Sequence, residues 1–430
     1  MKLKFALFSA CLLAALAVAP QRAVEAQQGT IKIGILHSLS GTMAISETTL
    51  KDTVLMLIDE QNKKGGVLGR KLEAVVVDPA SDWPLFAEKA RQLLEKDKVA
   101  VVFGCWTSVS RKSVLPVFEK DNGLLFYPVQ YEGEESSKNV IYTGAAPNQQ
   151  AIPAVDYLMK DLGVKRWVLE GTDYVYPRTT NKILEAYLKA KGVAAADISI
   201  NYTPFGHSDW QTRVAAIKRF GSAGKKTAVV STINGDANVP FYKELANQKV
   251  SAEDIPVVAF SVGEEELSGV DTKPLVGHLA AWNYFQSVKT PANDAFIKQW
   301  KTYIKKPNRT TNDPMEAHYV GFNLWVKAVE KAKSTDVEKV LAALPGLETP
   351  NLTGGIAKML PNHHITKPVY IGEVRADGQF DVVWKTPGTV PGDAWSDYLP
   401  TSKDTEADWV TLKCGNYNTK TKACSGQNYK

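Results

Sequence analysis

Short apolar runs alternate with segments of helical periodicity from Thr30 onward. Ile31–Leu39 is rich in apolar and β-branched residues, which is typical of a buried parallel strand. Apolar residues then recur mainly three or four positions apart, which predicts a helix that ends at Gly65-Gly66. Further strands are expected at Leu72–Val77, Val99–Trp106 and Leu124–Val129, with helices between them. Four such β–α units within roughly 100 residues predict a doubly wound parallel sheet.

A second α/β lobe is expected after the linker-like stretch Tyr142–Gln150. Its predicted strands are Arg166–Glu170, Ile198–Tyr202, Thr227–Thr232 and Pro256–Phe260. The helices predicted between them are Asn181–Lys191, Trp210–Phe220 and Val239–Asn247. Two such lobes favour a cleft for a ligand, because ligands of open α/β sheets bind beyond the carboxyl ends of the strands.

The last third of the chain is predicted to cross between the lobes again. A crossing is expected near Leu279–Phe285, followed by two helices and by a hairpin that turns at Asp377-Gly378. We therefore expect one lobe to contain residues 29–145 plus about 283–348. The other lobe would contain residues 146–282 plus about 349–400, and residues 401–430 would form a C-terminal tail.

The N-terminus carries the pattern of a secretory signal peptide. Lys2 and Lys4 precede the apolar run Phe5–Ala19, which is followed by the small-residue pattern Val24-Glu25-Ala26. A membrane anchor is the alternative, but the run is shorter than the ~20 apolar residues that a membrane span needs. We expect residues 1–26 to be removed by cleavage after about Ala26 and the protein to be exported to the periplasm.

Composition and charge exclude several classes of protein. Of 430 residues, 44% are hydrophobic and 23% are charged, which is ordinary for a folded globular chain and excludes a disordered one. The net charge is +5, and three basic residues but one acidic residue fall in the expected signal peptide. Because the remainder is nearly balanced, we expect no nucleic acid as a partner. We expect a monomer.

Three cysteines remain after the expected signal peptide. Cys414 and Cys424 bracket a polar loop near the C-terminus, and an oxidising compartment favours a disulfide between them. Cys105 lies in an apolar strand, where a free cysteine packs as a small hydrophobic residue.

Motifs of catalytic and cofactor-binding sites are absent from the sequence. It contains neither a P-loop motif nor a Gly-x-Gly-x-x-Gly motif after the first strand. None of the six histidines, including the adjacent pair His363-His364, has the spacing of zinc ligands. We therefore expect no cofactor and no metal. Cys105 lies at a strand-to-helix turn, so a secreted amidohydrolase with a cysteine nucleophile is an alternative, although no partner histidine has a recognisable spacing.

Loops rich in aromatic and short polar residues follow the predicted strands. Helix N-termini at such loops expose N–H groups for a carbonyl oxygen or an anion, and aromatic walls exclude water from a small ligand. Each loop alone is also explained as an ordinary cap or turn. Together they predict a binding site at one edge of the two sheets, formed by Ser38–Met43, Trp106–Ser108, Tyr127–Glu132, Thr172–Pro177, Ile233–Asp236 and Ser261–Glu266.

These loops resemble the urea-binding subunit of bacterial ABC urea transporters. That family is a branch of the Leu/Ile/Val-type periplasmic binding proteins and also includes sensors of short-chain amides. The similarity covers essentially the whole mature chain. The matching stretches are His37–Glu47, Gly104–Ser108 with Arg111-Lys112, Leu125–Gly133, Gly144–Gln150, Ser231–Asp236, Ala281–Ser287 and Asp313–Ala317.

The resemblance implies a type I periplasmic binding fold that closes on its ligand by hinge motion near Ala145 and Trp282 and then docks on membrane permease subunits. It implies a site in which backbone N–H groups near Ser108 bind the urea oxygen and oxygen atoms accept from the urea nitrogens. Tyr176 stands where the resemblance leads us to expect phenylalanine in urea binders, and amide sensors share the tyrosine. The expected ligand contacts are Met43, Glu47, Trp106, Thr107, Ser108, Tyr127, Pro128, Gln130, Tyr174, Tyr176, Asp236 and Glu265.

Other functions stay open alongside urea capture. A receptor for acetamide or another short amide would use the same loops. The amidohydrolase described above would use the same pocket, and a ligand-gated regulator is disfavoured because such sensors work in the cytosol. We expect a binding protein rather than an enzyme.

Overall fold

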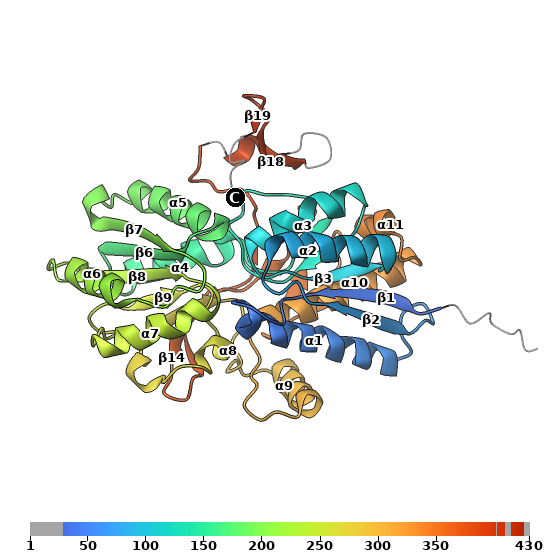
Figure 1. The fold of residues 1–430 in the computed structure, drawn as a ribbon, viewed down its shortest axis with the longest axis horizontal. Helices are drawn as coiled ribbons and strands as arrows, with labels where there is room; N and C mark the ends of the chain where they lie inside the picture. Colours follow the sequence, from blue (N-terminus) through green and yellow to red (C-terminus); the bar gives the residue numbers. More distant parts are fainter. Residues whose placement is uncertain (1–28, 401, 409–413, 425–430) are drawn as a thin grey trace, which may run out of the picture.

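The computed structural model describes residues 29–400, 402–408 and 414–424. Two α/β lobes lie side by side, and a small separate sheet near the C-terminus lies above them (Figure 1). The expected signal peptide and its cleavage site lie outside the described residues. The expected fold class, two α/β lobes built on largely parallel sheets, is confirmed.

The first lobe contains a five-stranded, wholly parallel sheet of strand order β2-β1-β3-β4-β5. Its strands are β1 (Ile31–Leu36), β2 (Leu72–Val77), β3 (Val101–Gly104), β4 (Leu125–Tyr127) and β5 (Val140–Tyr142). The helices between them are α1 (Ala44–Lys63), α2 (Trp83–Arg91), which continues into the π-helical turn η1 (Gln92–Lys96), and α3 (Ser108–Lys120). Three later helices pack on the same lobe: α9 (Pro291–Ile304), α10 (Asp313–Ala332) and α11 (Val337–Ala343).

Hydrophobic residues cover both faces of this sheet. Ile33 and Phe103 pack with Trp325 of α10 on one face, and Val102 packs with Phe118 of α3 on the other. Adjacent residues of a strand point to opposite faces, so a strand that is covered on both sides needs a continuous apolar run. This is why the strands are so readable in the sequence.

The second lobe contains a seven-stranded sheet of strand order β15-β14-β10-β9-β8-β6-β7. Its parallel strands are β6 (Arg166–Thr172), β7 (Ile198–Thr203), β8 (Thr227–Thr232), β9 (Val257–Ala259) and β10 (Leu279–Trp282). The antiparallel strands β14 (Tyr370–Val374) and β15 (Phe380–Lys385) are the predicted hairpin, which adds to one edge of the sheet. The helices are α4 (Ala151–Lys160), α5 (Val175–Ala190), α6 (Gln211–Gly221), α7 (Asn238–Asn247) and α8 (Glu264–Leu267).

Three segments connect the two lobes, and one side chain ties them together. They lie between β5 and α4, between β10 and α9, and between α11 and β14. The amide of Asn283, in the second segment, donates to the backbone oxygen of Gln149 in the first at 2.9 Å and of Pro368 in the third at 2.7 Å. Two small sheets lie along the third segment and the chain beyond β15: β11 (Glu348–Pro350) with β12 (Ile356–Lys358), and β13 (Thr366–Lys367) with β16 (Val390–Pro391).

The C-terminal tail forms a separate antiparallel sheet. Its strands are β17 (Thr405–Asp408), β18 (Cys414–Asn418) and β19 (Ala423–Cys424). The chain that leads into it contacts both lobes: Ser402 donates a hydrogen bond to Glu134, and Tyr398 packs edge-on against Tyr187 of α5. The side chains of Cys414 and Cys424 lie outside the described residues, so their disulfide stays a prediction.

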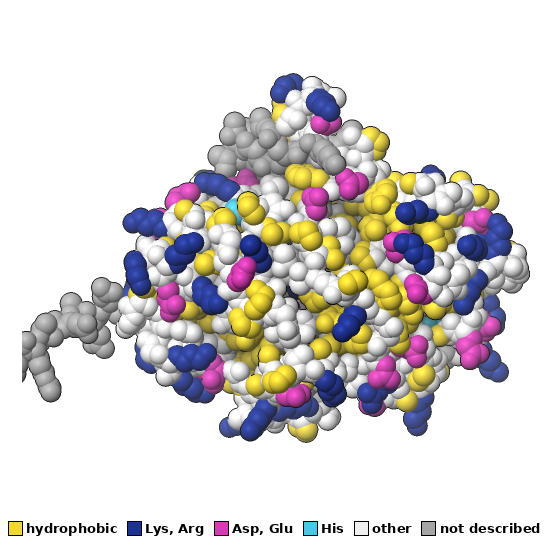
Figure 2. Space-filling view, turned by 180° about the vertical axis from the view of Figure 1, so that it is seen from behind, with side chains coloured by type: hydrophobic (Ala, Val, Ile, Leu, Met, Phe, Trp, Pro, Cys, Tyr) yellow, Lys and Arg dark blue, Asp and Glu magenta, His cyan; other side chains and the backbone are white. Residues whose placement is uncertain are grey.

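The surface carries charges of both signs. Seen from behind, basic and acidic side chains are interspersed over the two lobes, in agreement with 51 basic and 46 acidic residues (Figure 2). Within the described ranges, every helix is too short or too polar to span a bilayer.

Candidate ligand-binding site

The two lobes meet where the carboxyl ends of their strands face each other. We call this contact region the interlobe junction. The hydrogen bonds that cross it include Gln130 to Ser261 at 2.7 Å, Ser46 to Glu266 at 2.6 Å, the Asp236 amide to the Thr42 carbonyl at 3.1 Å, and the Trp106 indole to Asn234 at 3.4 Å. The lobes are therefore closed on each other, and side chains from both bury the space where a ligand of this fold binds.

Aromatic rings close the edge of the junction that lies farthest from the three connecting segments. Trp83, just after β2, approaches Phe205, just after β7, with ring centroids 5.3 Å apart. Phe205 also packs on Tyr174 at 4.8 Å. β2 and β7 are the outermost strands of their sheets on the side away from the connecting segments. We call Trp83 and Phe205 the aromatic rim.

The turn from β3 into α3 brings Trp106, Thr107 and Ser108 to the junction. Cys105 adopts a left-handed backbone conformation, with φ of 65°, which redirects the chain at the end of the strand. Thr107 caps α3 by accepting a hydrogen bond from the Ser110 amide at 3.1 Å. Ser108 is therefore the first helical residue, where backbone N–H groups have no partner within the helix.

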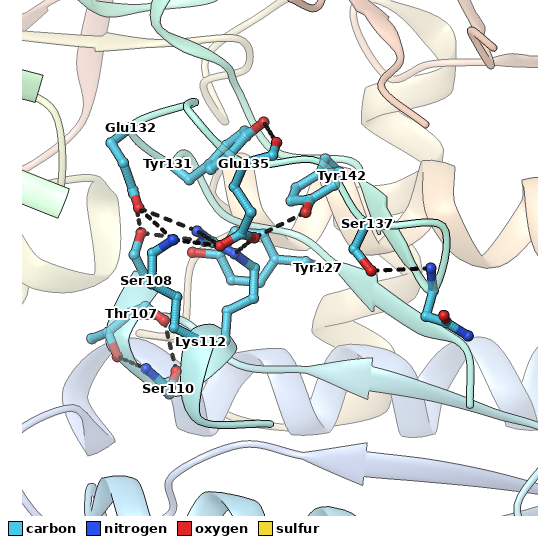
Figure 3. Close-up of polar contacts among 12 residues, drawn as sticks. Thr107, Ser108, Ser110, Lys112, Tyr127, Tyr131, Glu132, Glu135, Ser137 and Tyr142 are labelled. Carbon is cyan, nitrogen blue, oxygen red and sulfur yellow. Dashed lines mark hydrogen bonds and ion pairs between the residues drawn. The ribbon is translucent and has the colours of Figure 1, made fainter. Parts of the chain in front are cut away.

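The Ser108 hydroxyl belongs to a buried charge cluster in the first lobe (Figure 3). It donates to the carboxylate of Glu132 and accepts from the Arg111 guanidinium at 3.2 Å. Its one proton is used in this arrangement, and one oxygen lone pair is left. Ser108 thus offers a ligand an acceptor and no donor.

Arg111 is fully buried and its charge is compensated within the cluster. Its guanidinium donates to Glu135 at 2.7 Å and lies 4.7 Å from the centres of the Tyr127 and Tyr131 rings. Burial alone would lower the pKa of Arg111, but Glu135 and Glu132 raise it well above its ordinary value. Burial alone would raise the pKa of Glu135, but the charges of Arg111 and Lys112 outweigh the effect of burial and hold this pKa well below its ordinary value. The ion pairs therefore stay charged.

The end of β4 and the loop after it supply Tyr127, Pro128 and Gln130, all of which are buried. The Tyr127 hydroxyl donates to the Trp106 carbonyl, which links the loop to the β3–α3 turn. Gln130 uses its amide N–H to reach Ser261 of the other lobe, and its Oε1 atom has no hydrogen-bond partner. That atom is a buried acceptor available to a ligand.

The start of α5 supplies two tyrosines from the second lobe. Tyr174 precedes the helix and is 9% exposed, whereas Tyr176 lies in the first turn and is 2% exposed. Burial raises the pKa of Tyr176, and the nearby side chains of Gln130 and Ser261 lower it in part. The Tyr176 hydroxyl nevertheless lacks a hydrogen-bond partner of ordinary geometry. It is a buried donor that a ligand oxygen would satisfy.

The first turn of α1 supplies Met43 and Glu47. Met43 is buried and lies close to Gly235 of the second lobe. Glu47 is also buried; its Oε2 atom accepts from His37 at 3.0 Å and from the Ser38 amide at 2.9 Å, and its Oε1 atom has no partner.

Two of the expected carboxylates lie elsewhere. Asp236 has an exposed side chain and reaches the other lobe through its backbone amide alone. Glu265 accepts from the amide and hydroxyl of Thr310 at 2.7 Å and pairs with Arg309, so its oxygens are already occupied. Its neighbour Glu266 accepts from Ser46 in the first turn of α1, so both glutamates contact the first lobe, at different places.

Several residues of the junction were not expected to contact a ligand or position the site. Glu132, Ser261 and Asn234 lie within loops that the sequence singled out, but nothing in the pattern distinguishes them from their neighbours. Arg111 could have been suspected, since an arginine at an apolar position of a helix needs buried partners.

Cys105 has none of the properties of a nucleophile. Its side chain is fully buried, and burial followed by the nearby charge of Glu47 raises the pKa of the thiol. A nucleophilic cysteine needs a lowered pKa and access to substrate. His364, of the adjacent histidine pair, stacks on Tyr142 and is bonded to the Tyr131 hydroxyl at 2.6 Å. In the described part of the chain no three potential metal ligands are grouped together.

Comparison with known proteins identifies the family. Residues 31–401 match the family of the periplasmic binding protein domain. The chain belongs to this family. A Leu/Ile/Val-binding protein of Rhizobium johnstonii is 26% identical over 357 residues, which are 81% of this chain and 91% of that protein. A limonene hydroxylase of Geobacillus stearothermophilus is 33% identical over 120 residues, but the match spans 28% of this chain and 22% of that protein.

A solved structure shares the fold of this periplasmic binding protein. The solute-binding protein of an ABC transporter from Rhodopseudomonas palustris, in complex with p-hydroxybenzoic acid, has a TM-score of 0.72 and 21% identity. The similarity covers 85% of this chain and 98% of that one. The chain is a member of a family of binding proteins rather than of enzymes, and the family implies a periplasmic location.

Proposed function

We propose that this periplasmic binding protein captures urea in the interlobe junction and delivers it to the permease of an ABC transporter. Acetamide or another short amide is the second candidate, because it shares the carbonyl oxygen and one of the two amino groups of urea. The bound solute would lie between Ser108, Gln130 and Glu47 of the first lobe and Tyr176 of the second.

The set of unsatisfied buried atoms carries this proposal. Gln130 Oε1 and Glu47 Oε1 are acceptors without partners, the Ser108 hydroxyl has one lone pair left, and the Tyr176 hydroxyl is a donor without a partner. Leaving such groups buried and unpaired costs about 1–3 kcal/mol each. A small solute with several N–H donors and one carbonyl oxygen would satisfy them together.

The charge distribution favours a neutral solute over a carboxylate. Arg111 and Lys112, the basic residues beside Ser108, are both engaged in ion pairs with Glu132 and Glu135. Ser108 cannot donate to a carboxylate, since its proton is bonded to Glu132. Glu47 and Glu266 offer a carboxylate only oxygen atoms that already accept hydrogen bonds from the protein or are free to accept one. An amino acid or a benzoate is therefore a poor match for this junction.

Isothermal titration of the mature protein with urea, acetamide, leucine and p-hydroxybenzoate tests the proposal. We expect saturable urea binding, with acetamide weaker and the two carboxylates silent. Tighter binding of acetamide would move the protein to the amide branch. Heat from leucine or p-hydroxybenzoate alone would overturn the proposal.

A matched pair of serine variants ties the binding to the proposed place. Ser108→Ala removes an acceptor of the site, whereas Ser110→Ala removes a buried hydroxyl that bonds to the Thr107 carbonyl at 2.7 Å on the same helix. We expect Ser108→Ala to weaken urea binding by roughly tenfold and Ser110→Ala to leave it nearly unchanged. Equal affinities of the two variants would remove Ser108 from the site.

A further inference from the structure

A chain of three buried side chains lies behind the first turn of α1. Glu47 Oε2 is 3.0 Å from His37 Nδ1, and His37 Nε2 is 2.8 Å from His318 Nε2. The three residues are fully buried, and they come from α1, from the end of β1 and from α10. All belong to the first lobe, so the chain does not depend on closure of the lobes.

The hydrogen-bond partners assign the protons of this chain. Glu47 Oε2 also accepts from the Ser38 amide at 2.9 Å, so it is an acceptor and His37 Nδ1 carries a proton. When His37 is neutral, its Nε2 atom accepts and His318 donates from its own Nε2. His318 Nδ1 is left without a proton, in agreement with its lack of a partner. Burial, and then the neighbouring His37, lower the pKa of His318 well below its ordinary value, which keeps it neutral.

The chain places two donors on one oxygen of Glu47 and none on the other. The free Oε1 atom belongs to a residue at the interlobe junction: the adjacent Ser46 reaches Glu266 of the second lobe, and Met43 lies against Gly235. Glu47 also acts on the thiol of Cys105, which directly precedes Trp106. A buried carboxylate is stable in this setting when hydrogen bonds hold it, and its remaining oxygen calls for a further N–H group.

We propose that His37 and His318 are positioning residues that hold the Glu47 side chain in place and orient its Oε1 atom toward a solute N–H group. This inference rests on the proposed function and assigns one carboxylate to the recognition of an amino group. His318 lies in α10. The side chain of Asp313, the first residue of this helix, accepts a hydrogen bond at 2.8 Å from the backbone N–H of Asn283, which belongs to a connecting segment. The same helix therefore contacts both the hinge and the support of the site.

Two variants of His318 separate its donor from its bulk. His318→Gln keeps an N–H group able to reach His37, whereas His318→Phe keeps the size of the ring and removes the donor. We expect His318→Gln to bind urea within about threefold of the wild-type protein and His318→Phe to bind it roughly tenfold to a hundredfold more weakly. Equal binding by His318→Phe and the wild type would overturn the inference, as would equal weakness of both variants in their folded form.

His278 provides the matched control. It is a buried histidine of the second lobe that accepts from the Val257 amide at 3.1 Å, and burial lowers its pKa to about 4. We expect His278→Phe to lower thermal stability and to keep urea affinity within about threefold, since His278 takes no part in the hydrogen bonds that link Glu47, His37 and His318. A loss of affinity equal to that of His318→Phe would mean that any buried histidine gives the effect, which would overturn the inference.

Nitrogen NMR of the imidazoles tests the chain without a ligand or a variant. We expect a protonated Nδ1 in His37 and a protonated Nε2 with a bare Nδ1 in His318. A charged His318, or the opposite tautomers, would overturn the inference. A wild-type protein with these tautomers that binds neither urea nor acetamide would instead overturn the proposed function.

Discussion

At the scale of single residues, Glu264 is a carboxyl group whose protonation depends on folding. It is buried at the start of α8 and accepts from the Gln286 amide at 2.7 Å. Burial, with a smaller contribution from the neighbouring Glu266 and Glu265, raises the pKa of Glu264 to about 8 in spite of that hydrogen bond. The folded protein therefore holds a proton that the unfolded chain releases near pH 4.5.

This shift predicts how stability depends on pH. Between about pH 4.5 and about pH 8 the folded state binds more protons at Glu264 than the unfolded state, so its contribution to stability is full below this window and is lost as pH rises through it. We expect the melting temperature of Glu264→Gln to fall less between pH 5 and pH 8 than that of the wild type. Parallel melting profiles of the two proteins would contradict this.

Neighbouring glutamates of α8 also show how far the sequence could specify the site. The pattern predicted correctly that the loop after β9 carries acidic groups to the edge of the sheet. It selected Glu265, which bonds to Thr310 between α9 and α10, whereas Glu266 bonds to Ser46 in the first turn of α1. A helix of four residues has no repeat from which its orientation can be read, and a step of one residue turns a side chain by about 100°.

Tyr176 makes a residue-scale prediction for binding. Tyr176→Ala removes a buried ring and an unpartnered hydroxyl, so we expect urea binding to weaken by about 1–3 kcal/mol. Tyr176→Phe should retain the contribution of the ring and lose that of the hydroxyl. Titration calorimetry of both variants measures the contributions of the ring and of the hydroxyl to urea affinity. Unchanged affinity in both variants would remove Tyr176 from the site.

At the scale of elements, the ion pairs of Arg111 hold α3 against the loop after β4. Arg111→Met leaves Glu132 and Glu135 buried without their main counter-charge. Breaking a buried pair on one side costs about 3–5 kcal/mol. We expect a loss of this size in the free energy of unfolding. Thermal or guanidinium denaturation measures it, since urea is the proposed ligand and cannot serve as the denaturant.

Arg375 is the control for that measurement. It forms ion pairs with Asp377 and Asp381 on the exposed hairpin of β14 and β15, where such pairs contribute less than about 1 kcal/mol. Arg375→Met should therefore change stability little. A similar effect of both substitutions would mean that burial of the Arg111 pairs is unimportant.

Elements with long apolar periodicity were predictable, and short or irregular ones were not. The strands β1, β6 and β8 lie close to the expected positions because they are covered on both faces. Strand β5 and helix α4 were not expected, since β5 has three residues and α4 follows directly on the linker-like stretch. The edge position of β14 and β15 depends on a distant part of the chain returning to the sheet, which local patterns do not encode.

At the scale of the whole molecule, closure brings backbone into close contact at Gly235. This residue has φ of 69°, and a Cβ atom would lie 2.6 Å from the Thr42 oxygen and 2.9 Å from the Met43 sulfur, both in the opposite lobe. Gly235 thus permits the two lobes to approach. The sequence predicted two lobes and a cleft, but their mutual contacts arise only when both are folded and docked.

Gly235→Ala tests the importance of this approach. We expect it to hold the lobes apart and to weaken urea binding roughly tenfold or more, because overpacking here costs about 1–3 kcal/mol. Small-angle X-ray scattering should show a ligand-induced decrease in radius of gyration for the wild type and little for the variant. Gly163→Ala is the control: it has the same φ of 69° and open space around its Cβ, so it carries the backbone strain without the clash.

The aromatic rim lies at the edge of the junction that is farthest from the three connecting segments. Trp83 and Phe205 follow the outermost strands, whereas Asn283 ties together the connecting segments, about which the lobes are expected to turn. A small rotation about the connecting segments would displace the atoms around Asn283 little. It would move the rings of Trp83 and Phe205 apart by a larger distance, because they lie farther from those segments. A permease that contacted the lobes near this rim would exert the greatest torque for a given force, and we expect the ring contact to be the first that opening of the lobes breaks.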